Sequence, residues 1–195
     1  MKPETVRTGA TERGYTMKLA KAVMGRERSI RMNKDESLHV FDKDGNEVVF
    51  FQGKGASVKG TAEDFAKIPQ NSIITHNHPK ALGKKGFLAI GNSFSIDDLN
   101  TAIKTNAAEM RAVTPTYTFS VKRPEKGWGV TSKQLAKVYS DALTKERMRG
   151  TSYAYKAKTN KEFDVRKDRY ASVAFHNIMT NVAKQFGWDY TKKRG

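Results

Sequence analysis

The segment NSIITHNHPK, residues 71–80, carries two histidines separated by one residue. The apolar residues before them predict a buried strand, and strand side chains repeat every two residues, so His76 and His78 project to the same side. Pro79 restricts His78 to extended geometry, which keeps the second imidazole in register with the first. Two imidazoles placed in this way can bind one metal ion, although a polar end to a buried strand would show the same pattern.

Catalytic zinc sites have three protein ligands and an open position, so a third ligand is needed. The chain contains no cysteine, which leaves His, Asp or Glu for this role. Asp98 in SFSIDDL is the best candidate, because Ser95 can cap a helix there and would place Asp98 in its first turn. Ser-x-x-Asp is also an ordinary capping box, and that interpretation stays open. Asp97 is an alternative ligand, or a first-turn acid that suits the helix dipole.

Around these residues the sequence predicts strands and helices up to about residue 125. Two β-rich runs flank the turn residues 42–46 and predict a hairpin. The other expected elements are a helix over 16–25 that stops at Gly25, a helix over 61–68, a strand over 72–75 that ends at the histidines, a helix from Ser95 whose apolar face reaches Met110, and a strand over 116–122. Together they predict an α/β fold, with a mixed central β-sheet flanked by helices.

Beyond Pro124 the pattern becomes helical and basic. Residues 134–148 predict one helix, and the polar residues 151–164 predict an irregular segment. A second helix is predicted by the apolar stripe Phe175, Ile178, Val182 and Phe186, and the tail TKKRG closes the chain. We therefore expect a leader with a short helix over 1–28, a metal-binding domain over 29–128 and a basic helical extension over 129–195.

Charge is the main compositional signal: 36 Lys and Arg against 20 Asp and Glu give a net charge of +16. This imbalance indicates contact with nucleic acid or another polyanion, and a basic, solvated surface explains it equally well. The candidates for phosphate contact are Lys133, Lys137, Lys145, Arg147, Arg149, Arg166, Lys167 and Arg169. No apolar run approaches the roughly 20 residues of a membrane-spanning helix, and no secretory signal is visible, so we expect a soluble protein without a membrane partner.

HNHP followed by SFSIDD resembles the signature of the JAMM/MPN metalloprotease-like superfamily, H-x-H-P and then S-x-x-D, and is most similar to its RadC-like and phage-associated branches. The resemblance runs from about Glu36 to Trp128. It implies a fold like that of JAMM proteins and cytidine deaminases. It also implies that His76, His78 and Asp98 bind Zn²⁺, and that Ser95 helps to orient the site and the oxyanion.

The family uses a glutamate at the start of an early strand as general base, and the resemblance assigns this role to Glu36, with Glu27 as the alternative. Glu36 would also suit a solvated charge at a strand edge. The stretch Lys80 to Asn92 makes the link from His78 to Ser95 longer than family members usually have, so we expect a different substrate groove or lid.

The expected activity is zinc-dependent hydrolysis of amide or isopeptide bonds in protein or peptide substrates. We expect such a protein in the cytoplasm, or in a virion or larger assembly if it is phage-encoded. A second hypothesis is a non-enzymatic protein that associates with nucleic acid or builds a virion while keeping the fold. A third is a structural subunit in which the pocket is an inherited remnant.

Overall fold

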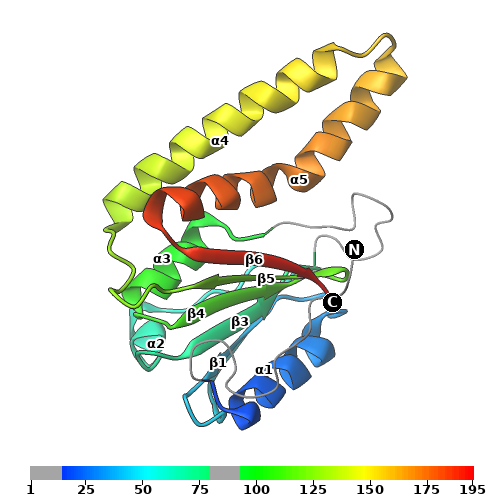
Figure 1. The fold of residues 1–195 in the computed structure, drawn as a ribbon. Helices are drawn as coiled ribbons and strands as arrows, with labels where there is room; N and C mark the ends of the chain where they lie inside the picture. Colours follow the sequence, from blue (N-terminus) through cyan, green and yellow to red (C-terminus); the bar gives the residue numbers. More distant parts are fainter. Residues whose placement is uncertain (1–14, 80–92) are drawn as a thin grey trace, which may run out of the picture.

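The computed structural model describes residues 15–79 and 93–195, which form a six-stranded sheet with helices on both faces (Figure 1). The strands are β1 Ser37–Phe41, β2 Glu47–Gln52, β3 Ile73–Asn77, β4 Glu109–Val113, β5 Tyr117–Lys122 and β6 Asp189–Arg194. Their order is β2-β1-β3-β4-β5-β6, and the pair β3 and β4 is parallel while the other neighbours are antiparallel. The predicted mixed α/β sheet flanked by helices is therefore confirmed.

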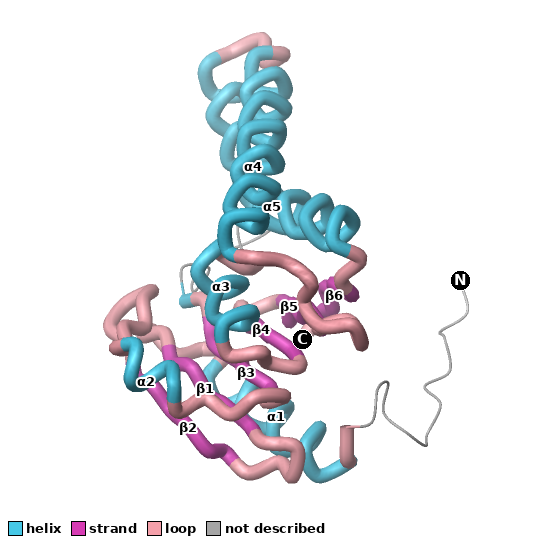
Figure 2. Tube along the Cα trace, turned by 90° about the vertical axis from the view of Figure 1, so that its left-hand side faces the viewer, coloured by secondary structure: helices cyan, strands magenta, loops and turns pink. Residues whose placement is uncertain are grey.

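The helices divide between the two faces of the sheet. Helix α1, Met17–Ile30, lies against one face, and α3, Ile96–Lys104, lies against the other together with parts of α4, Ser132–Tyr155, and α5, Asn160–Phe186 (Figures 1 and 2). The short helix α2, Ala62–Ala66, begins at Thr61 with a capping box, in agreement with the helix expected over 61–68.

The face toward α3 holds the main apolar core. Alternate residues of β1, β3, β4 and β5 point into it, as the two-residue strand period requires. Its members include Leu38, Val40, Ile74, Met110, Ala112, Phe119 and Val121 from the sheet and Leu99, Leu135, Ile178 and Val182 from the helices. His76 belongs to the same face because it follows Ile74 by two residues.

The opposite face, toward α1, is unusually polar for a buried surface. A small apolar cluster of Leu19, Val23, Phe41 and Ile73 anchors the helix. Beside it, Glu27 of α1 lies against this face of the sheet and accepts hydrogen bonds from Arg111 and from the Thr75 hydroxyl. Arg111 also bonds Glu109, which accepts from Ser120. Polar groups in a dry layer are stable only when they are paired, and these are.

Two expected boundaries were wrong in the first part of the chain. Helix α1 continues through Gly25 to Ile30, because Glu27 and Ile30 are buried and their tertiary contacts outweigh the low helix propensity of glycine. Met110 lies in strand β4 and not on the helix that Ser95 begins, since α3 ends at Lys104 and Asn106 turns the chain with a positive φ of 51°.

The C-terminal part also differs from expectation. Residues 151–164, expected to be irregular, are mostly helical, because α4 extends to Tyr155 and α5 begins at Asn160. The two helices pack along each other as a hairpin whose turn lies far from the sheet in Figures 1 and 2. The tail forms β6, which pairs with β5 and brings Trp188 against Trp128. The expected extension therefore includes a strand of the sheet.

Within the ranges 15–79 and 93–195, none of the helices has the length and apolar composition that crossing a membrane requires. Residues 1–14 of the expected leader and the long link from Lys80 to Asn92 lie outside the described residues.

Candidate metal centre

The two histidines lie at the end of β3, as the sequence predicts. His76 is its last but one residue, and His78 continues the extended chain because its N–H donates to the Val113 carbonyl oxygen at 2.8 Å. The two Nε2 atoms are 2.9 Å apart. His76 is buried and the His78 side chain is 14% exposed, so the pair has access to solvent through His78.

Asp98 lies in the first turn of α3, beside both histidines. Its Oδ1 lies 3.4 Å from His76 Nε2, and its Oδ2 lies 3.8 Å from His78 Nε2. The Ser95 N–H and hydroxyl both donate to Oδ2, at 2.7 and 2.8 Å, and the Ser95 Oγ accepts from the Asp98 N–H. The capping box and the candidate ligand are thus the same residues, and the cap fixes the carboxylate beside the imidazoles.

Glu36, the residue before β1, lies beside the same two histidines. The register pairs Leu38 with His76, and continuing it by two residues sets Glu36 across from His78 on the same face of the sheet. One ligand atom each from Glu36, His76 and His78 lies within 4.8 Å of the other two. Glu36 is half-buried, so its carboxylate has a route to solvent. Both carboxylates therefore border the histidine pair.

The charges of the centre depend on one another. Burial would raise the pKa of Asp98, but the two imidazoles and the Ser95 N–H outweigh it and hold the pKa below its usual range. Burial would lower the pKa of His76, but Asp98 and then Glu36 outweigh it and raise the pKa. The carboxylates therefore favour positive charge at the imidazoles, and a cation can supply that charge in place of a proton.

The spacing of these atoms fits a small cation. Two ring nitrogens 2.9 Å apart can share one proton, or both can direct lone pairs at a metal ion. Zinc–nitrogen bonds of about 2.0–2.1 Å in a tetrahedron separate the ligand atoms by about 3.3 Å. The two Nε2 atoms are 2.9 Å apart, and the distances to the nearer Asp98 oxygen, Oδ1 for His76 and Oδ2 for His78, are 3.4 and 3.8 Å, on either side of that value. Two imidazoles and a carboxylate also form a donor set that suits zinc and other divalent transition metals.

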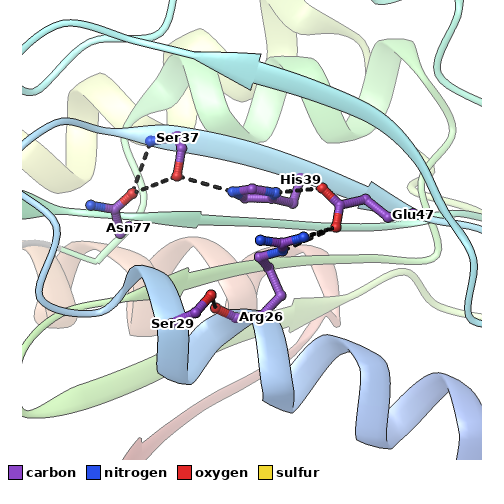
Figure 3. Close-up of polar contacts among 6 residues, drawn as sticks. All are labelled: Arg26, Ser29, Ser37, His39, Glu47 and Asn77. Atoms are coloured by element: carbon purple, nitrogen blue, oxygen red, sulfur yellow. Dashed lines mark hydrogen bonds and ion pairs between the residues drawn. The ribbon is translucent and has the colours of Figure 1, made fainter.

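Other acids and histidines are accounted for elsewhere. Asp97, the alternative ligand, is exposed. Glu27, the alternative general base, is bonded to Arg111 on the opposite face of the sheet, so it does not join this site. His39 is buried between the Ser37 hydroxyl and Glu47 (Figure 3). His176 contacts the Tyr190 hydroxyl at 2.9 Å through Nδ1.

One residue of the site was not singled out from the sequence. Asn77 separates the two histidines, and its side chain lies on the face toward α1, where it contacts the chain around Ser37 (Figure 3). The sequence pointed to Asn77 only as a polar residue on the second face of a buried strand.

Comparison of the chain with known protein families, curated proteins and solved structures finds no match.

Proposed function

We propose that this chain is a metal-dependent hydrolase of amide or isopeptide bonds in protein or peptide substrates, with an active site and fold of the JAMM type. His76, His78 and Asp98 would hold the cation, and zinc is the ion that this donor set favours. The observation that carries the proposal is the convergence of these three side chains, from a strand end and a helix start, on a space a few ångströms wide.

A bound divalent cation would supply Lewis acidity, which acidifies a water molecule and polarises a carbonyl group. The roles of the protein groups follow from their positions. Glu36, half-buried beside His76 and His78, would accept the proton of the attacking water and deliver it to the leaving amine. Ser95 would hold Asp98 through its hydroxyl. To orient the oxyanion, the role that the resemblance implies, this hydroxyl would have to turn from Asp98, because it has one proton to donate.

The cation itself provides the first test. The purified chain is expected to bind about one Zn²⁺ and to hydrolyse members of a fluorogenic peptide-amide library. A chelator should abolish this activity, and added Zn²⁺ should restore it. The double variant His76→Ala, His78→Ala should bind no Zn²⁺ in calorimetry, because it loses two of the three ligands. Asp97→Asn, which alters an exposed acid beside Asp98, is the matched control and should bind Zn²⁺ like the wild type.

Two results would count against the proposal. The first is a double variant that still binds Zn²⁺ at the wild-type affinity, since the ion would then lie elsewhere. The second is a metal-loaded wild type that hydrolyses no peptide or isopeptide bond.

The hairpin of α4 and α5 favours a second function, association with nucleic acid. Residues 132–186 contain twelve Lys and Arg against five Asp and Glu. Near the turn, Lys156, Lys158 and Lys161 are exposed, and the neighbouring Tyr155 is 75% exposed, a combination that can contact phosphates and stack on a base. A basic hairpin that extends from a site-bearing domain would also suit a virion protein, which is the setting that the resemblance implies.

Salt dependence tests this second function. If the hairpin turn contacts DNA, replacing Lys156, Lys158 and Lys161 by Gln should lower the slope of log affinity against log salt by about 2.7, or about 0.9 for each phosphate that is no longer neutralised. Binding would be measured by fluorescence anisotropy with labelled duplex and single-stranded DNA. The matched control replaces Lys21, Arg28 and Lys34, exposed residues on and after α1, and should leave the slope unchanged. Equal effects of both triple variants would indicate binding without a role for the hairpin.

A further inference from the structure

Asn77 holds the chain on both sides of Glu36. Its side chain is fully buried and points to the face opposite the one used by its neighbours His76 and His78. The Oδ1 atom accepts the Ser37 N–H at 2.8 Å and contacts the Ser37 Oγ at 3.2 Å. The Nδ2 atom donates to the Asp35 carbonyl oxygen at 3.1 Å. One carboxamide therefore bonds the peptide groups immediately before and after Glu36.

These hydrogen bonds lie just beyond the end of the backbone hydrogen-bond ladder between β1 and β3. The pairing of the two strands ends at Leu38 and His76, so residues 35–37 lie beyond the last paired residues. Asn77 supplies an acceptor and a donor in the place that a peptide group of a longer partner strand would occupy. A second contact, from Nδ2 to the Asn33 carbonyl oxygen at 3.4 Å, extends the same attachment toward α1.

The other edge of Glu36 is held by the loop after β2. The Glu36 N–H donates to the Gly55 carbonyl oxygen at 2.6 Å, and the Gly53 N–H donates to the Glu36 carbonyl oxygen at 2.8 Å. Gly53 is required there, because a Cβ atom would lie 2.3 Å from the Ser57 carbonyl oxygen and 2.7 Å from that of Glu36. Glu36 is thus held between a glycine loop and the side chain of Asn77.

The attachment continues through a series of polar groups that begins at buried Ser37 and His39 and ends at the partly exposed pair Glu47 and Arg26 (Figure 3). The Ser37 Oγ lies 3.0 Å from His39 Nε2, and His39 Nδ1 lies 2.8 Å from Glu47, which accepts from Arg26 of α1. Ser37 and His39 are only 2% and 3% exposed, so their hydrogen bonds are closed to substrate and serve to fix β1. They limit how far Ser37, and with it Glu36, can move.

We propose that Asn77 is a positioning residue that sets the distance of Glu36 from the cation held by His76 and His78. The inference rests on the proposed function, in which Glu36 is the general base. Asn77 is covalently joined to both histidines and hydrogen-bonded to the residues on both sides of Glu36, so it links the ligands directly to the segment that carries the base. General bases require such control, because a misplacement of about 1 Å can lower a rate about 100-fold.

The test uses the full-length chain with the substitution Asn77→Ala. We expect kcat to fall about 100-fold with KM within about threefold of the wild type, because ground-state binding does not depend on Glu36. Co²⁺ affinity, measured by calorimetry, should also stay within about threefold. In a Glu36→Gln background, Asn77→Ala should cause no further loss of activity, since the group through which it acts is already removed.

A readout independent of activity accompanies these rates. With Co²⁺ bound, paramagnetic shifts of the Glu36 and Ser37 amide signals should change in Asn77→Ala, while that of Ala112 in β4 should not. The matched control is Thr75→Val, at a fully buried position on the same face of the same strand, whose hydroxyl bonds Glu27 and not the Glu36 loop. Thr75→Val should leave kcat and the paramagnetic shift of the Glu36 amide signal unchanged even if it lowers the free energy of unfolding.

If Asn77→Ala does not fold, Asn77→Asp takes its place, because it keeps an acceptor for the Ser37 N–H and loses the donor to the Asp35 carbonyl. Additive losses with Glu36→Gln, an unchanged Glu36 shift, or a loss of Co²⁺ affinity equal to the loss of kcat would each overturn the proposal. A wild type that binds Co²⁺ and hydrolyses no amide would refute the proposed function, while the shifts would still show whether Asn77 sets the position of Glu36.

Discussion

Replacing Glu36 by Gln is expected to lower kcat for amide hydrolysis by about 10²- to 10⁴-fold, the range that loss of a general base produces. Gln has the shape of Glu, and the half-buried side chain should keep its place. It cannot accept a proton from water, so the chemical step should slow while substrate binding, and therefore KM, changes little. Steady-state kinetics with the Zn²⁺-loaded protein measures both quantities.

The same variant distinguishes two arrangements of the site. Glu36 lies close enough to His76 and His78 to be a ligand, and Asp98 also lies beside both histidines. If Asp98 is the third ligand, Glu36→Gln should keep its Zn²⁺ affinity and Asp98→Asn should lose most of it. The reverse order of affinities would make Glu36 a ligand, and a Glu36→Gln variant with wild-type kcat would remove it from the reaction altogether.

Much of the site could be predicted from the sequence because its geometry is local. The two-residue strand period fixes the common side of His76 and His78, and the capping box fixes Asp98 at the start of α3. Both rules act over four residues or fewer, and the structure agrees with both. The hairpin around residues 42–46 was equally accessible, since Asp42 caps its turn by accepting the N–H groups of Asp44 and Asn46.

The features that could not be predicted depend on contacts between distant parts of the chain. Strand β6 exists because β5 offers an open edge more than sixty residues earlier, and the six residues DYTKKR alone have the composition of a polar tail. Helix α1 continues past Gly25 because Glu27 meets Arg111, which lies 84 positions away. The contact of Asn77 with Ser37 spans 40 positions in the same way. Neither periodicity nor turn chemistry contains such information.

Truncating Arg111 is expected to have the largest effect on stability. Its guanidinium donates to Glu27 through Nε at 2.6 Å and Nη2 at 3.0 Å, and to Glu109 through Nη1 at 2.7 Å. Burial would lower the pKa of Arg111, but the two carboxylates outweigh it and raise the pKa, so the side chain stays charged. Arg111→Ala leaves Glu27 and Glu109, 3% and 1% exposed, without that charge. The free energy of unfolding should fall by about 3–5 kcal/mol.

Urea denaturation monitored by circular dichroism measures this decrease, and Arg26→Ala is the matched control. Arg26 also pairs with a glutamate, Glu47, but their side chains are 40% and 24% exposed, so water can replace the missing partner and the cost should be about 0–1 kcal/mol. Decreases of equal size in the two variants would mean that the α1 face of the sheet is hydrated. The difference between the two decreases therefore measures how much the stability of the buried α1 face depends on Arg111, the cation shared by Glu27 and Glu109.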